Sequence, residues 1–297
     1  MPEDLGALLA LHRAAVISIL PQFAGARFSV VKDGRDFATL EADGWMVRLP
    51  RHDQAAQRLK RECATLAYLR PRITMTLPQM ALEDARLPFT RHTRIDGVPL
   101  TPALYRSLDI GRRNAIALRL AQFYAELHAL PLPRMRSVGA VGAEPWMSPT
   151  AVLAGALPRL PRKHHPFVRQ TVRAYRKLSI SGDDLVFGYY GGHGENMALD
   201  DKTGLLNGLF DFADAGFGSR HRDLGYSNGV SSDLTLRIIE RYEALTGRTV
   251  DRSVVMLYRS VLRLAELGSE RHDAAHSQAR MLDWIEQMDA TGLAAAA

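Results

Sequence analysis

The sequence predicts an α+β fold in two lobes, a small antiparallel sheet with one long helix followed by a mostly helical lobe. Short segments rich in β-branched and aromatic residues, separated by Asp-Gly turns, fill residues 27–50. Beyond residue 100, apolar residues recur every three or four positions, which is typical of helices that bury one face. The chain has 297 residues, 46% of them hydrophobic, which is enough for the core of one large domain or of two lobes.

The first lobe is expected to contain an opening helix, five strands and one long helix. The opening helix is predicted over residues 3–20, and the long helix runs from a cap at Asp53 to Pro71. The five strands are predicted at residues 28–31, 37–40, 45–49, 78–82 and 87–95. The next four residues, DGVP at 96–99, are predicted to form a hinge, so the lobes are placed at residues 1–96 and 97–297.

The second lobe is expected to be built mainly from helices. These are predicted at residues 109–130, 151–160, 171–178, 233–245 and 251–267. A strand pair is predicted at residues 197–199 and 206–210, around a polar turn. The segment 131–166 is rich in Pro and Gly and is expected to be an ordered insertion.

The formal net charge of +6 is divided unevenly along the chain. Residues 1–179 contain 27 Lys and Arg against 14 Asp and Glu, whereas residues 180–297 contain 11 against 18. The basic residues are scattered through predicted helices and form no run interleaved with aromatics, so nucleic-acid binding is not expected. The basic part can attract the phosphates of a nucleotide, and the acidic part suits a cationic or polyhydroxylated substrate.

No targeting segment and no membrane span is expected. The first five residues include acids ahead of the first apolar stretch, and no apolar run approaches the roughly 18 residues that cross a bilayer. The single cysteine, Cys63, excludes an internal disulfide and suits a reducing compartment. A cytoplasmic protein is therefore predicted.

Two motifs indicate phosphoryl transfer. The sequence YYGGHGEN at residues 189–196 is followed by LFDFAD at 209–214. Asp211 follows a hydrophobic strand, where its carboxylate can bind a Mg²⁺ ion that bridges two phosphates, and Asn196 can give a neutral oxygen to the same ion. His272 and His276 are four residues apart, but we expect them to lie on a solvated helix face rather than to bind a metal.

The first motif resembles the His-Gly-Asp-x-His-x-x-Asn loop of the aminoglycoside phosphotransferase and choline kinase group, relatives of the protein kinases. Shorter matches follow in the family's order: VRLP at 47–50, LKRE at 59–62, LP at 77–78, IDGVPL at 95–100, LHAL at 127–130 and DL at 223–224. The resemblance extends from about residue 28 to about residue 264. It implies a bilobal protein-kinase-like fold that binds ATP or GTP with Mg²⁺ between its lobes and phosphorylates a small hydroxylated acceptor, neutral or cationic.

The resemblance also implies roles for residues of the first lobe. Arg48 takes the place of the Lys that contacts nucleotide phosphates, and Glu62 is its partner on the following helix, although an Arg-Glu pair is otherwise an ordinary salt bridge. The turn at residues 33–35 is either the loop that covers the phosphates or a plain hairpin turn. Three hinge residues are assigned to nucleotide binding: Arg94, Ile95 and Asp96.

The main departure from the family pattern lies at position 191. Gly191 stands where the family has the Asp that acts as general base, and Tyr189 and Tyr190 replace the preceding His-Gly. Glu195 is a candidate substitute base. His193 is a candidate proton acceptor, although the family uses this His to organise the loop.

Two functions are therefore open. The first is an ATP- or GTP-dependent O-phosphotransferase with an alcohol acceptor, weakened or disabled at Gly191. The second is a pseudokinase that binds nucleotide and reports it to a partner. In a third interpretation, Gly191 is an introduced change in an active parent. The segments expected to contact the acceptor, roughly 131–180 and 225–297, contain no transferable motif.

Overall fold

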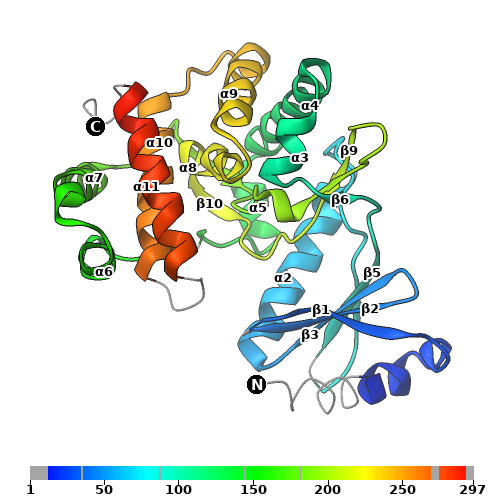
Figure 1. The fold of residues 1–297 in the computed structure, drawn as a ribbon. Helices are drawn as coiled ribbons and strands as arrows, with labels where there is room; N and C mark the ends of the chain where they lie inside the picture. The colour runs from blue at the N-terminus through cyan, green and yellow to red at the C-terminus, as the bar shows by residue number, and fades with distance from the viewer. Residues whose placement is uncertain are drawn as a thin grey trace.

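The structure, a computed structural model, describes residues 13–34, 36–86, 88–143, 145–180, 182–268 and 274–291. A five-stranded antiparallel sheet with one long helix comes first in the chain, and a larger, mostly helical part follows (Figure 1). The predicted α+β fold is thus confirmed. The boundary between residues 96 and 97 stays a prediction.

The sheet has the strand order β1-β2-β3-β5-β4. Asp43 (φ 47°) and Gly44 (φ 83°) form the two-residue turn between β2 and β3, because a left-handed turn matches the twist of a hairpin. The fourth strand is shorter than predicted, since Pro78 has no N–H for a sheet hydrogen bond. The strands are β1 (Phe28–Asp33), β2 (Phe37–Ala42), β3 (Trp45–Pro50), β4 (Ala81–Glu83) and β5 (Phe89–Thr93).

Helix α2 (Asp53–Leu69) packs against β3 and β5. The predicted cap at Asp53 is wrong: the ring of His52 accepts the N–H of Ala55, and Asp53 is the first helical residue. Its carboxylate still lies in the first turn, where the helix dipole favours a negative charge. Of the predicted opening helix, residues 13–19 are helical and residues 1–12 lie outside the described part.

The linker after β5 is attached to the second part by a short strand. This strand, β6 (Val98–Pro99), pairs with β8 (Met197–Leu199), which in turn pairs with β9 (Leu206–Leu209). Gly97 has a φ of 141°, and a Cβ there would lie 2.8 Å from the backbone carbon of Ala198. The predicted hinge is therefore partly a strand, packed directly on the strand that follows the YYGGHGEN motif.

The helical part has its main core between α4 and α9, where Leu120, Phe123, Leu234 and Ile238 are fully buried. Helices α3, α5, α8 and α11 were not predicted, nor was the pairing of β7 (Leu185–Gly188) with β10 (Gly216–Ser219). The helices are α3 (Pro102–Ser107), α4 (Ile110–His128), α5 (Leu132–Ser137), α6 (Pro149–Ala156), α7 (His165–Lys177), α8 (Arg220–Gly225), α9 (Ser232–Thr246), α10 (Arg252–Gly268) and α11 (Ala274–Thr291).

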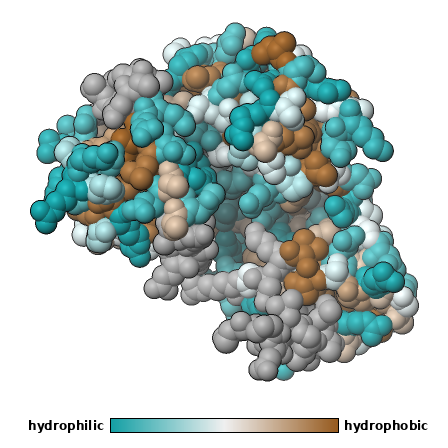
Figure 2. All heavy atoms as spheres, viewed as in Figure 1, coloured by the Kyte–Doolittle hydropathy of each residue, from teal (hydrophilic) through white to brown (hydrophobic). Residues whose placement is uncertain are grey.

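The face of the molecule shown in Figure 2 is mainly hydrophilic where it is coloured, and it is hollowed between the sheet and the helical part. Within the described residues, no helix combines the length and the apolar character that crossing a bilayer requires.

Candidate functional site

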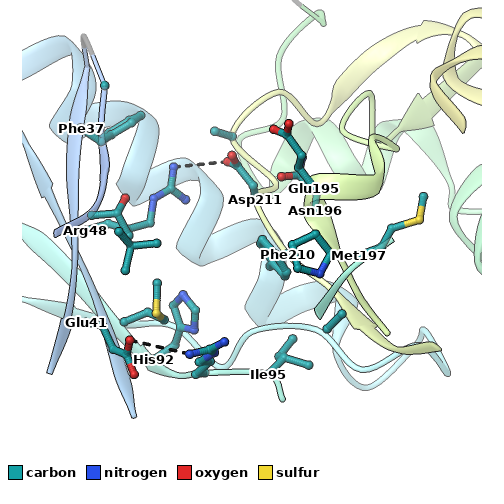
Figure 3. Close-up of a pocket in the computed structure, with 18 of the residues that line it drawn as sticks. Phe37, Glu41, Arg48, His92, Ile95, Glu195, Asn196, Met197, Phe210 and Asp211 are labelled. Carbon is teal, nitrogen blue, oxygen red and sulfur yellow. Dashed lines mark hydrogen bonds and ion pairs between the residues drawn. The ribbon is translucent and has the colours of Figure 1, made fainter. Parts of the chain in front are cut away.

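A cleft between the sheet and the helical part contains most of the residues predicted to bind nucleotide and metal. Its volume is about 1280 Å³, above the roughly 300–1,000 Å³ of ordinary small-molecule sites. Arg48 and His92 lie on the sheet side of the cleft, and Asn196 and Asp211 lie opposite them (Figure 3). The cleft therefore has room for a nucleotide together with part of an acceptor.

Other predicted site residues divide between the cleft and its surroundings. Arg94 and Ile95 line the cleft at the linker. Gly34 of the predicted phosphate-covering turn also lines it, whereas Arg35 lies outside the described residues. The carbonyl of Asp96 accepts a hydrogen bond from Asn207 Nδ2 at 2.8 Å. Four predicted residues are not part of the cleft lining: Glu62, Asp96, Gly191 and His193.

Arg48 and Glu62 form a buried, bidentate ion pair. Arg48 Nη1 donates to Glu62 Oε1 at 2.8 Å and Oε2 at 2.7 Å, and Glu62 Oε1 also accepts the N–H of Phe212 at 2.9 Å. Burial alone would lower the pKa of the Arg48 guanidinium. The neighbouring carboxylates of Glu62 and Asp211 have the larger effect, so the pKa is raised. Burial likewise raises the pKa of Glu62, against the charge of Arg48 and the N–H of Phe212. We assign the ionised pair, because Glu62 accepts three hydrogen bonds.

This pair connects three separate segments of the chain. Arg48 comes from β3, Glu62 from α2, and Phe212 from the LFDFAD motif. Arg48 Nη2 lies 3.4 Å from Asp211 Oδ1, so the guanidinium points toward the carboxylate predicted to bind metal (Figure 3). The same contacts thus position the cation predicted to bind phosphate and the carboxylate predicted to bind metal at one end of the cleft.

Asn196 and Asp211 have the chemistry of a Mg²⁺ site. Asn196 Nδ2 donates to the carbonyl of Gly191 at 2.9 Å, which leaves its Oδ1 for a cation. The Asp211 side chain is 33% exposed, and its φ of 60° is a conformation that non-glycine residues rarely adopt. Among the described residues, no group of three or more His, Cys, Asp or Glu could hold a metal ion. An amide and one carboxylate still fit Mg²⁺, which takes its other ligands from phosphates and water.

The backbone of the YYGGHGEN motif is held by one buried carboxylate. Asp223 is 0% exposed and accepts the N–H groups of Tyr189 at 2.8 Å and Tyr190 at 2.6 Å. His128 Nε2 lies 3.1 Å from the same carboxylate, and its Nδ1 lies 3.1 Å from the hydroxyl of Tyr242. Sequence reasoning identified Asp223 and His128 only as family matches. Because their partners are 33 to 114 residues away, no local spacing could show that they anchor the loop.

Position 191 has no room for a side chain in this structure. Tyr189 is fully buried, its ring lies 4.5 Å from that of Phe212, and its hydroxyl donates to the carbonyl of Phe210. A Cβ on Gly191 would lie 2.8 Å from Tyr189 Cε2 and 3.1 Å from the carbonyl oxygen of Asp211. Two of the residues that replace the family pattern are therefore packed against each other, which the one-dimensional motif could not show.

The two candidate substitute bases differ in their surroundings. Burial, and then the charge of Arg259, lower the pKa of His193 to about 4, so this ring is neutral and weakly basic at neutral pH. The His193 ring packs edge-on against Tyr226 at 4.8 Å. Glu195 is exposed and lines the cleft. Of the two, only Glu195 faces the space where a nucleotide would lie.

The fold is that of a kinase-like phosphotransferase. It combines an Arg-Glu pair between a strand and a helix, a loop anchored by a buried carboxylate, and an Asp that follows this loop and lines the cleft. The model of the phosphotransferase enzyme family matches residues 27–258. The chain therefore belongs to the phosphotransferase enzyme family, as the resemblance implied.

Solved structures of low sequence identity share the fold over nearly their whole length. Wild-type aminoglycoside 2'-phosphotransferase-IIIa with GDP has a TM-score of 0.75 at 17% identity, covering 96% of this chain and 99% of that one. The streptomycin-ATP ternary complex of APH(2")-IIa has a TM-score of 0.61 at 14% identity, with coverages of 91% and 96%. Macrolide 2'-phosphotransferase MphH from Brachybacterium faecium has a TM-score of 0.60 at 20% identity, with coverages of 93% and 97%. No curated protein matches this chain significantly.

Proposed function

We propose that the protein is an ATP- or GTP-dependent O-phosphotransferase of small hydroxylated molecules, with slow turnover because position 191 has no carboxylate. The observation that supports this most is the link from Arg48 through Glu62 to Phe212, which sets Arg48 beside Asp211 in the cleft. The single cysteine supports a cytoplasmic location for this activity.

In the proposed reaction the acceptor oxygen forms a bond to the γ-phosphorus while the bond to the bridging oxygen of the nucleoside diphosphate breaks. The acceptor's hydroxyl proton leaves to solvent. Arg48 would bind the nucleotide phosphates, and Asn196 with Asp211 would hold Mg²⁺, which offsets the phosphate charge. A general base contributes about 10²–10⁴-fold in rate, so positioning and charge can sustain slow transfer without it.

The nucleotide donors follow from the relatives. Structures of the family's fold have been solved with GDP and with ATP, which supports both GTP and ATP as donors here. The acceptors named in those structures are not carried over, because this chain shares less than a quarter of its residues with them.

A nucleotide-binding module without catalysis is the second candidate. The packing of Tyr189 against Gly191 favours it, because the place where the family's base begins is filled by a ring. Both candidates require nucleotide binding, and only the first requires turnover.

A thermal-shift titration with Mg²⁺ and ATP or GTP tests the nucleotide site. We expect the wild-type Tm to rise with nucleotide only when Mg²⁺ is present, and Asp211→Ala to lose most of that rise. Asp201→Ala, which removes an exposed turn carboxylate outside the cleft, is the matched control. No rise with either nucleotide would reject the proposal. Nucleotide consumption measured on the same samples separates the slow enzyme from the binding module.

A further inference from the structure

Arg259 of α10 is a buried cation whose guanidinium makes no hydrogen bond within the described residues. Its side chain is 2% exposed, and Nε, Nη1 and Nη2 have no hydrogen-bond partner in the described part of the chain. Burial lowers its pKa to about 10, yet a guanidinium stays charged at neutral pH. The charge of Glu266 favours the guanidinium, but no described residue hydrogen-bonds to its nitrogens. A buried charge without hydrogen bonds is unfavourable, so these nitrogens suit an acceptor atom of a ligand.

The guanidinium borders a small open space next to the YYGGHGEN loop. A Cβ built on Gly229 would have only two heavy atoms within 4 Å, Arg259 Nη2 at 3.8 Å and His193 Nδ1 at 4.0 Å. This distance is an ordinary van der Waals contact, so the space accommodates one more heavy atom without displacing a neighbour. Arg259 and His193 thus face the same small volume, with two nitrogens available to an acceptor atom of a ligand.

The space is close to the position where phosphoryl transfer would take place. The His193 N–H donates to the carbonyl of Gly191 at 2.7 Å, and Gly191 occupies the place of the family's base. The residue whose ring borders the space is therefore joined by one backbone hydrogen bond to the position of the family's base.

The surrounding charges also favour an anion. Arg263 lies one turn after Arg259 on α10, and its Nε is buried without a hydrogen-bond partner within the described ranges. Its Nη1 donates to the carbonyl of Arg280 on α11. The positive charges of Arg259 and Arg280 lower the pKa of Arg263 further than burial does alone, to about 9. The carboxylates of Glu266 and Asp283 act in the opposite direction, so three arginines share two carboxylates here.

We infer that the acceptor of this site carries an anionic group, a carboxylate or a phosphate monoester, which Arg259 binds beside Gly229 and His193. The inference rests on the proposed phosphotransferase function and names its substrate class. It departs from the cationic acceptor that the acidic composition suggested, because the charge next to the reactive position is positive. An anion at this place would accept hydrogen bonds from a guanidinium that the described residues leave without any.

Four probes with one three-carbon hydroxylated skeleton test the inference: glycerol, glycerate, glycerol 3-phosphate and 2-amino-1,3-propanediol. Binding is measured by thermal shift and calorimetry on protein saturated with Mg²⁺ and a non-hydrolysable nucleotide, so that anions do not enter the nucleotide site. We expect glycerate or glycerol 3-phosphate to bind and the neutral and cationic probes to bind at least about tenfold more weakly. Comparison of the affinities of glycerate and glycerol 3-phosphate shows whether the site prefers a carboxylate or a phosphate monoester.

Two variants test the location. Gly229→Ala fills the space beside Arg259 without a steric clash and should fold normally but lose about tenfold or more in anion affinity. Arg259→Met should lose the anion response and raise the Tm of the ligand-free protein, because it removes an uncompensated buried charge. Arg252→Met, at the start of the same helix, removes a surface pair with Glu243 and is the matched control.

Three outcomes would overturn the inference. They are equal binding of all four probes, an anion response that survives both variants, and a lower Tm of ligand-free Arg259→Met, which would mean that the guanidinium already stabilises the fold. Nucleotide binding is measured separately in the same samples, so its loss would reject the proposed function and not be confused with a failure of anion binding.

Discussion

The ring of Tyr189 lies where a side chain at position 191 would begin, 2.8 Å from the Cβ that Gly191 lacks. The space in which a side chain at position 191 would begin is therefore filled by the residue two positions earlier. The Tyr189 ring is fixed by Phe212 and by its hydrogen bond to Phe210, and its backbone is held by Asp223. Restoring the carboxylate alone therefore creates a clash in a well-packed region.

We expect Gly191→Asp alone to destabilise the protein and to give little gain in activity. The motif alone would suggest that this single change restores transfer, but Tyr189 must move to admit it. The double variant Tyr189→His with Gly191→Asp should raise phosphoryl transfer by about 10²–10⁴-fold over wild type. Turnover is compared for the wild type, both single variants and the double variant. A Gly191→Asp variant as fast as the double variant would show that Tyr189 yields easily.

Glu62→Gln should lower the free energy of unfolding by more than the loss of a less buried Arg-Glu pair does. It leaves the Arg48 guanidinium, 8% exposed, without its partner charge, a loss of about 3–5 kcal/mol. Arg48 should then turn to Asp211 and weaken Mg²⁺-dependent nucleotide binding. Urea unfolding and nucleotide titration measure the two effects.

Glu83→Gln is the matched control for Glu62→Gln. Glu83 pairs with Arg91 at 2.6 Å in the same sheet, with side chains 17% and 25% exposed. Its loss should cost about 0–1 kcal/mol. If both variants lose the same free energy of unfolding, the Arg48–Glu62 pair stabilises the fold no more than the Arg91–Glu83 pair does.

Asp184 should make stability depend on acidic pH. It is bonded by His221 Nδ1 at 2.5 Å. Burial would raise the pKa of Asp184, but the hydrogen bonds from His221 and Ser219 outweigh it and hold the pKa below its ordinary value. The unfolded chain then binds the proton more readily. The contribution is therefore complete above the unfolded pKa of about 3.9 and is lost as pH falls through the lower folded pKa.

Asp184→Asn should lower the free energy of unfolding by about 1–3 kcal/mol near neutral pH. The difference from wild type should shrink below about pH 4. Urea unfolding at several pH values measures it, with Asp201→Asn on an exposed turn as control. A difference that stays constant down to strong acid would contradict the assignment.

Gly97→Ala should disturb the connection between the sheet and the helical part. Its φ of 141° is unfavourable for alanine, and the added Cβ would lie 2.8 Å from the backbone of Ala198. Gly44→Ala also places an alanine at a positive φ (83°), but no atom lies within 4 Å of the added Cβ. This substitution should therefore lower the free energy of unfolding by only about 1 kcal/mol. We expect a larger fall in Tm for Gly97→Ala, together with weaker nucleotide binding. Equal falls would show that backbone strain alone matters at both positions.

Much of the fold and part of the site could be read from the sequence, because those features depend on local patterns. Strand and helix periods, the Asp43-Gly44 turn and the order of the family motifs all lie within short segments. Three of the residues that these motifs singled out, Arg48, Asn196 and Asp211, line one cleft in the structure, and their roles stay a prediction. Helix α11 was missed, although its buried residues Met281, Trp284, Ile285 and Met288 recur at helical spacing.

The tertiary structure decided what occupies position 191 and what remains unpaired. The rotamer of Tyr189 decides whether there is room for a side chain at position 191. Contacts with Phe212 and Phe210, more than 20 residues further along the chain, fix this rotamer. Whether Arg259 is a surface charge or a buried one depends on how α10 packs on α8 and α11. The space at position 191 and the burial of Arg259 both arise from contacts between segments that are distant in the sequence. A local pattern of residue types does not show which distant side chains come into contact.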